Sequence, residues 1–248
     1  MPPKRILILG GTSDARTIAS RLHAADCDVT TSLAGVTRDP HLPPGAVRRG
    51  GFGGAEGLAD YIGQERFDAL IDATHPFAAQ ISTHAVLAAQ STQTPLLRFE
   101  RPAWQRMEGD RWFEVASITK AVAALPNGAR VFLTIGRKDI APFLGRDDLS
   151  GIIRSIEVPK IGLPPAWQLR TARPPFSVAE ERELMSRERI THLVTKNAGG
   201  DDTSAKLEAA RALGLPAVMI ARPRKPDAFC VSKLSDVERW LSRTLPTD

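Results

Sequence analysis

Several apolar runs in the sequence end directly in glycine, hydroxyl or charged residues, the types that bind phosphates and transfer protons. The first is segment 6–16, "ILILGGTSDAR", where the apolar run stops at two glycines and a helical pattern follows. At such a turn the free backbone N–H groups and the helix dipole attract a phosphate. The turn matches the dinucleotide fingerprint G-x-G-x-x-G/A except that a threonine replaces the second glycine. We interpret it as a cofactor-binding turn, although a plain strand–helix turn would need no ligand; its residues are Gly10, Gly11, Thr12, Ser13, Asp14 and Ala15.

The second apolar run, "VTTSLAGVTR" at 29–38, indicates which dinucleotide would bind. A site for NAD normally ends its second strand in an acidic residue that holds the ribose 2′-hydroxyl. No acidic residue occurs here before Asp39, and Ser32 and Arg38 would both suit a 2′-phosphate. The sequence therefore favours NADPH as cofactor, unless Arg38 is simply a solvated loop residue. Gly51 and Thr74, in later glycine-rich and polar loops, complete the predicted cofactor site.

Three titratable residues, His75, Asp14 and Lys196, are candidates for the proton transfer that must accompany hydride chemistry. His75 ends an apolar run, and the proline that follows it favours an extended backbone. Asp14 lies in the first turn of a predicted helix, where it either caps that helix or faces the reacting ring. Thr74 and Asn197 are rivals, and a proton taken from solvent would require none of these residues.

The sequence predicts that alternating strands and helices position these residues. Strand patterns occur near 5–9, 28–32, 68–72 and 95–99, and helical periodicity near 13–25, 55–65 and 77–90. After a charged, aromatic stretch at 100–112, strands are predicted near 130–135, 152–157, 191–195 and 216–220, with helices near 117–124, 178–189 and 203–213. The alternation predicts an α/β protein with two Rossmann-like or flavodoxin-like domains, mainly parallel sheets and an interdomain cleft. We expect residues 1–104 to form the NADP-binding domain and residues 105–248 the second domain, which contributes to the substrate cleft.

The composition of the chain limits the kinds of partner that it could bind. The 248 residues carry a net charge of +5, which favours an anionic ligand. Aromatic residues make up only 6% of the chain and no basic run is interleaved with them, so nucleic acid is a poor candidate. Two cysteines far apart predict neither a disulfide framework nor a metal site. With no apolar run long enough for a membrane span, we expect no membrane partner and a cytoplasmic location.

Seven motifs, in order along both halves of the chain, resemble those of the precorrin-6A reductase family of cobalamin biosynthesis. They are "GGTSDAR" at 10–16, "SLAG" at 32–35, "RGGFGG" at 49–54, "DATHPFA" at 72–78, "RFERPAW" at 98–104, "TIGRKD" at 134–139 and "TKNAGG" at 195–200. The resemblance implies two α/β domains with the active site between them. It also implies NADPH-dependent reduction of one double bond of the precorrin-6A macrocycle, giving precorrin-6B. The "GRKD" loop departs from the more common version with small residues.

Such a substrate is a flat ring rimmed with carboxylates, so it needs cationic side chains at the rim and apolar or aromatic faces inside. Trp104 and Phe77 could face the ring. The substrate-binding candidates follow predicted strands or lie on the crossing between domains: Arg98, Arg101, Trp104, Arg137, Lys138, Lys196 and Asn197. Any one of these cations could equally form a surface ion pair. Whether the natural ring is metal-free or carries cobalt stays open.

Two other classes of protein are compatible with parts of this pattern. A non-catalytic α/β nucleotide or anion sensor would use the same turn and arginines without chemistry. A methyltransferase also begins with a glycine turn, but it normally requires an acidic residue at the end of the second strand, and that residue is missing here.

Overall fold

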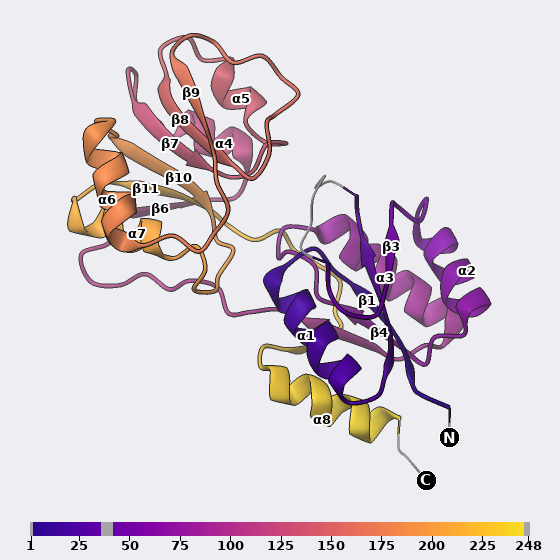
Figure 1. The fold of residues 1–248 in the computed structure, drawn as a ribbon. Helices are drawn as coiled ribbons and strands as arrows, with labels where there is room; N and C mark the ends of the chain where they lie inside the picture. The colour runs from indigo at the N-terminus through magenta and orange to yellow at the C-terminus, as the bar shows by residue number, and fades with distance from the viewer. Residues whose placement is uncertain (1, 36–41, 246–248) are drawn as a thin grey trace. The chain divides into compact units, whose positions relative to one another are not determined.

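The computed structural model describes residues 2–35 and 42–245, and these divide into two compact units (Figure 1). Unit 1 comprises the chain up to Pro102 together with the segment from Pro223 onward, and unit 2 comprises Ala103–Arg222. Each unit holds one six-stranded sheet in which every pairing is parallel. The predicted α/β class with two Rossmann-like domains is confirmed.

Unit 1 has the strand order of a classic dinucleotide-binding sheet, β3-β2-β1-β4-β5-β12. Its strands are β1 (Arg5–Leu9), β2 (Asp28–Leu33), β3 (Ala46–Arg49), β4 (Ala69–Asp72), β5 (Leu96–Phe99) and β12 (Phe229–Val231). Its helices are α1 (Ser13–Ala24), α2 (Ala55–Glu65), α3 (Ala79–Thr92) and α8 (Leu234–Thr244). The strand order reverses between β1 and β4, so ligands of this sheet are expected at the carboxyl ends of these two strands.

The core of unit 1 follows from the unbroken apolar sequence of β1, which buries both faces of the strand. Ile6 and Ile8 pack with α1 and α8 on one side of the sheet, whereas Leu7 and Leu9 pack with α2 and α3 on the other. Figure 1 shows the yellow α8 beside the indigo α1, although the whole chain separates them in sequence.

Unit 2 repeats the same order of strands, β9-β8-β7-β10-β11-β6. Its strands are β6 (Trp112–Val115), β7 (Arg130–Thr134), β8 (Ser150–Ser155), β9 (Trp167–Thr171), β10 (His192–Lys196) and β11 (Ala217–Ile220). Its helices are α4 (Ile118–Ala123), α5 (Ala141–Leu144), α6 (Val178–Arg187) and α7 (Ala205–Ala212). The switch in strand order now falls between β7 and β10, which correspond to β1 and β4 of unit 1.

The sixth strand of the unit 1 sheet comes from outside the run of chain that builds its other five strands, whereas the six strands of unit 2 are continuous in sequence. In sequence β6 follows the five strands of unit 1 yet pairs with β11 of unit 2, while β12 follows unit 2 yet pairs with β5 of unit 1. The prediction that residues 105–248 form the second domain was therefore wrong for the segment from Pro223 onward. The physical reason is that β12 completes the sheet of unit 1 and that Val237 and Leu241 of α8 are buried in its core.

Candidate functional site

The glycine turn after β1 is built as a close junction of strand, helix and neighbouring strand. The Gly10 N–H donates to the Ser32 carbonyl at 2.9 Å, and a Cβ on Gly10 would lie 2.8 Å from the Thr31 methyl group. Gly11 has φ +110° and no atom within 4 Å of where its Cβ would be. Any other residue would be strained there, and the space beside the turn stays open to a ligand.

Thr12, the residue that departs from the fingerprint, joins the two strands at the switch point. Its hydroxyl donates to the Ala73 carbonyl at 2.9 Å and accepts from the Ala15 N–H at 3.0 Å, which makes Thr12 the N-cap of α1. The hydroxyl is therefore committed within the protein, and it ties the glycine turn to the loop after β4.

Asp14 and Arg101 were predicted for different roles and lie together in unit 1. The Arg101 guanidinium is 3.1 Å from the Asp14 carboxylate, and both side chains are partly buried. Because Thr12 caps the helix, the carboxylate of Asp14 is not needed for capping. Ser13 lies next to it in the first turn of α1, and Ala15 is buried against the sheet.

At the end of β2, Ser32 is buried and lies beside an arginine that the sequence analysis missed. Arg48 of β3 is the register partner of Ser32, and its Nη1 lies 3.5 Å from the Ser32 hydroxyl. Its guanidinium also donates to the carbonyls of Gly50 and Gly51 at 2.7 and 2.8 Å and stacks 3.9 Å from the centre of the Phe52 ring. The basic pair directly before "GGFGG" was the signal that could have pointed to it. Arg38 lies outside the described residues.

The loop after β4 carries Thr74 and His75. The Thr74 hydroxyl donates to Oδ1 of Asp72 at 2.6 Å, and its N–H donates to the same oxygen at 3.2 Å. The Phe77 N–H donates to Nδ1 of His75 at 3.2 Å, so in the neutral ring the proton is on Nε2. The rings of His75 and Phe77 lie 5.8 Å apart.

Arg98, which was predicted to bind substrate, is buried in an ion pair between β4 and β5. The residue is only 6% exposed, its Nε lies 3.4 Å from the Asp72 carboxylate, and its Nη1 donates to the Pro226 carbonyl at 2.8 Å. Cys230, its register partner on β12, is exposed, and incomplete hydration of its thiol, reinforced by the Glu100 carboxylate, raises the pKa of the thiol. Neither the ion pair nor the place of Cys230 beside Arg98 could be predicted, because the pairing of β5 with β4 and with β12 could not be read from the sequence.

In unit 2 the switch point brings together the cations predicted after β7 and β10. Lys196 lies 2.5 Å from the Asp139 carboxylate, and this pair links the two loops. Arg137 pairs with Glu157 at 2.8 Å, and Lys138 is exposed in the same loop. These three cations belong to the predicted substrate-binding residues and lie at the carboxyl ends of the strands of unit 2.

Trp104 and Asn197 have structural roles in unit 2. The Trp104 N–H donates to the Asn197 side-chain oxygen at 2.8 Å, and the Asn197 amide donates back to the Trp104 carbonyl at 3.2 Å. The indole donates to the Gly200 carbonyl at 2.8 Å, and Lys206 lies 4.7 Å from its ring centre. The indole also packs on the core of unit 2. In this structure the polar groups of both side chains are thus bonded within unit 2.

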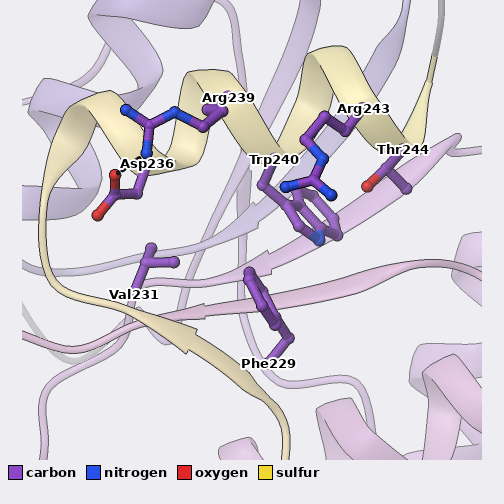
Figure 2. A pocket seen from close by; sticks show the side chains of 7 residues that line it. All are labelled: Phe229, Val231, Asp236, Arg239, Trp240, Arg243 and Thr244. Atoms are coloured by element: carbon purple, nitrogen blue, oxygen red, sulfur yellow. Dashed lines mark hydrogen bonds and ion pairs between the residues drawn. The ribbon is translucent and has the colours of Figure 1, made fainter.

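A hollow of about 640 Å³ lies elsewhere, between β12 and α8 at the edge of the unit 1 sheet (Figure 2). Phe229 and Trp240 line it together with Arg239 and Arg243, and Arg239 pairs with Asp236 at 2.9 Å. None of the residues at the switch point reaches it, so we do not assign it to the site.

Within residues 2–35 and 42–245, no group of three or more histidine, cysteine or acidic side chains could hold a metal ion. No helix in this part of the chain is both long and apolar enough to cross a membrane.

The two sheets and the glycine turn at the first switch point define a protein of the Rossmann-like α/β class. Residues 5–242 match the model of the family described as precorrin-6x reductase CbiJ/CobK, and the chain belongs to this family. A precorrin-6A reductase from Rhodococcus erythropolis is 49% identical over 90% of this chain and 91% of its own length. One from Rhodobacter capsulatus is 44% identical over 96% of both chains. The solved structure of a CobK precorrin-6A reductase superposes with a TM-score of 0.93 at 43% identity, covering 98% of each chain.

Proposed function

We propose that the protein reduces one double bond of precorrin-6A with NADPH, giving precorrin-6B in cobalamin biosynthesis. Membership of the reductase family supports the reaction. The observation that carries the choice of cofactor lies at the carboxyl end of β2. There Ser32 lies beside the Arg48 guanidinium, and the last residues of the strand, Thr30–Leu33, include no carboxylate. A ribose diol would lack its usual acceptor there, whereas a 2′-phosphate would gain a hydroxyl and a cation.

The residues of unit 1 fit a dinucleotide. The open space beside Gly11 and the N-terminus of the 12-residue helix α1 suit a pyrophosphate, because the positive end of a helix dipole attracts an anion. Register places Ser32, Leu9 and Asp72 side by side on neighbouring strands, so the 2′-phosphate end and the switch point lie along one edge of the sheet. We assign Gly10, Gly11, Ser13, Ser32, Arg48, Gly51 and Thr74 to the cofactor site.

Bound NADPH would supply the hydride, and the chain must orient the reactants and manage one proton. Among the candidates, His75 has the clearest geometry for proton donation. Its Nδ1 accepts the Phe77 N–H, which keeps the proton of the neutral ring on Nε2, the atom able to donate. Asp14 and Lys196 are each held by an opposite charge, so in this structure they serve better to orient a ligand than to transfer a proton.

On the substrate side we propose that Arg137, Lys138 and Lys196 bind carboxylates of the macrocycle. All three lie at the carboxyl ends of β7 and β10, the switch point of the second sheet. Their present partners, Asp139 and Glu157, are the acidic groups that a substrate carboxylate would replace.

The direct test is an anaerobic assay of NADPH oxidation with precorrin-6A, with the product identified by its mass. We expect one NADPH to be oxidised for each macrocycle that gains two hydrogens. Stoichiometric NADPH binding without oxidation in the presence of the substrate would contradict the proposal and favour the sensor function.

A further inference from the structure

The buried ion pair between β4 and β5 lies directly beneath the candidate site. Asp72 and Arg98 are register partners on these neighbouring strands, and they are 1% and 6% exposed. A charge pair buried this deeply is expensive to desolvate and is often no more stable than an apolar pair of the same size. Its presence at the last residue of β4, where the loop to the site begins, therefore requires a reason other than stability.

The Asp72 carboxylate holds the first turn of the loop after β4. Its Oδ1 accepts both the hydroxyl and the N–H of Thr74, while its Oδ2 faces Nε of Arg98. Between them, the Ala73 N–H donates to the Leu9 carbonyl and the Ala73 carbonyl accepts the Thr12 hydroxyl. The carboxylate and Thr12 thus fix the loop from opposite sides, one at Thr74 and one at Ala73.

The Arg98 guanidinium connects this loop to the returning C-terminal segment. Its Nη1 donates to the Pro226 carbonyl at 2.8 Å, three residues before β12 begins. Close by, Lys225 pairs with Glu100 at 2.7 Å, which holds the same segment against the end of β5. The Nη2 atom of Arg98 is buried and has no hydrogen-bond partner among the described residues, so the side chain is constrained without being fully satisfied.

This geometry argues against a direct contact between Arg98 and a substrate carboxylate. To reach a ligand, the guanidinium would have to leave Asp72 buried without its counter-charge and release Pro226. A buried arginine that instead bridges a site loop and a distant chain segment is suited to hold the loop in one conformation.

We propose that Asp72 and Arg98 are positioning residues for the reaction: the pair fixes Thr74, and through it the loop from Ala73 to Phe77 that carries His75. The proposal rests on the proposed function, because it assumes that this loop contacts the cofactor. It assigns Asp72, which the sequence analysis did not select, a role through Thr74 and not through contact with the reacting atoms.

The experiment compares Asp72→Ala, Asp72→Asn and Thr74→Val with the unchanged protein. Steady-state kinetics, NADPH affinity and hydrogen exchange of the peptide spanning residues 72–78 are measured for each variant. Asp72→Ala removes the acceptor and should lower kcat/KM about a hundredfold, mostly in kcat, because small misplacements at a reacting centre are costly. Asp72→Asn keeps an acceptor for Thr74 and should recover a large part of the activity, and it also serves if the alanine variant does not fold.

The double variant Asp72→Ala/Thr74→Val tests the route of the effect. If Asp72 acts through Thr74, the double variant should be about as slow as the slower single variant, since residues that act as one unit are not additive. Independent, multiplying effects would overturn the proposal.

Unit 2 offers a matched control. Arg154 and Glu181 form a comparably buried ion pair between β8 and α6, with Arg154 9% and Glu181 1% exposed in their side chains. Glu181→Gln should lower stability yet leave kcat/KM within about twofold of the unchanged protein, because its pair holds no loop at the first switch point. An equal loss of kcat/KM in Glu181→Gln and Asp72→Ala would assign both effects to general destabilisation and overturn the proposal.

Hydrogen exchange separates the failure of this proposal from failure of the proposed function. If the unchanged protein neither binds NADPH nor reduces precorrin-6A, the proposed function fails. Even then, Asp72→Ala should raise exchange in the 72–78 peptide about tenfold or more if the pair holds the loop. Unchanged exchange in that peptide would show that the carboxylate does not position the loop.

Discussion

At the scale of single residues, Thr12 departs from the dinucleotide-binding fingerprint and has a structural role. The glycine expected at this position would allow closer approach of a pyrophosphate. The threonine hydroxyl instead caps α1 and binds the Ala73 carbonyl, and so it joins the two strands at the switch point. The sequence indicated the turn and placed Thr12 in the cofactor site. It could not indicate the bond to Ala73, because the position of Ala73 depends on how β4 pairs with β1.

Replacing Thr12 should therefore cost stability. Thr12→Val keeps the shape and removes both hydrogen bonds of the hydroxyl, so we expect the free energy of unfolding to fall by about 1–2 kcal/mol. Urea unfolding measures this loss. Thr12→Ser, which keeps the hydroxyl, should lose clearly less than the valine variant; equal losses would mean that the methyl group and not the hydroxyl matters.

Arg48 should determine the preference for the phosphorylated cofactor. Arg48→Met removes the cation beside Ser32 and should weaken NADPH binding about tenfold while leaving NADH binding unchanged, because only the 2′-phosphate requires the charge. Arg49→Met is the charge-matched control, since neighbouring residues of a strand point to opposite faces and Arg49 is exposed. Equal effects of both variants on NADPH would indicate a general charge effect instead of a specific contact.

At the scale of elements, α2 begins where the glycine-rich loop of residues 49–54 ends, and its first turn packs against that loop. A Cβ on Gly57 would lie 1.9 Å from the Phe52 carbonyl oxygen, an impossible contact with backbone. Phe52 in turn carries the Arg48 guanidinium on its ring. The glycine thus allows the helix to approach the loop that holds the arginine.

Two glycine-to-alanine substitutions in α2 should change the stability of the protein in opposite directions. Gly63→Ala meets no atom within 4 Å and should stabilise the protein by about 0.5–1 kcal/mol, the ordinary gain of alanine over glycine in a helix. Gly57→Ala should destabilise it by about 1–3 kcal/mol, because the loop must move away from the helix. Thermal or urea unfolding of both variants gives the comparison, and stabilisation by Gly57→Ala would contradict the packing described here.

The long apolar strands and the helices that follow them could be predicted from the sequence to within a few residues. Exposed edge strands could not: β3 contains two arginines in four residues, and two of the three residues of β12 are exposed, whereas the four-residue strands β4 and β5 are mostly apolar and largely buried. Such strands are defined by their neighbours in the sheet and not by their own pattern. The missed site residues, Arg48 and Asp72, matter through pairings that involve these or neighbouring strands.

At the scale of the whole molecule, the chain leaves unit 1 after five strands and returns to it for the sixth. The stability of unit 1 therefore depends on α8, which lies more than 200 positions from β1 in sequence and packs on the same core. The sequence could not indicate this return, because an amphipathic helix at the end of a chain fits either domain equally well.

Leu241→Ala tests the discontinuous unit. Leu241 is 5% exposed in the core formed with β1 and α1, so the truncation should cost about 2–5 kcal/mol. Hydrogen exchange should rise in β1, β2 and α1, while β7 and β10 keep their protection. Leu241→Met, which conserves volume, should leave both sheets nearly unchanged. Increased exchange confined to unit 2 would contradict the assignment of α8 to unit 1.

The measurement that bears most directly on the proposed activity is a fluorescence titration of the purified protein with NADPH and with NADH. We expect NADPH to bind at least about tenfold more tightly, because Ser32 and Arg48 would contact a 2′-phosphate at the end of β2, where the described residues of the strand supply no carboxylate to hold a diol. Equal affinity for the two dinucleotides, or binding of neither, would contradict the assignment of this turn and strand to NADPH.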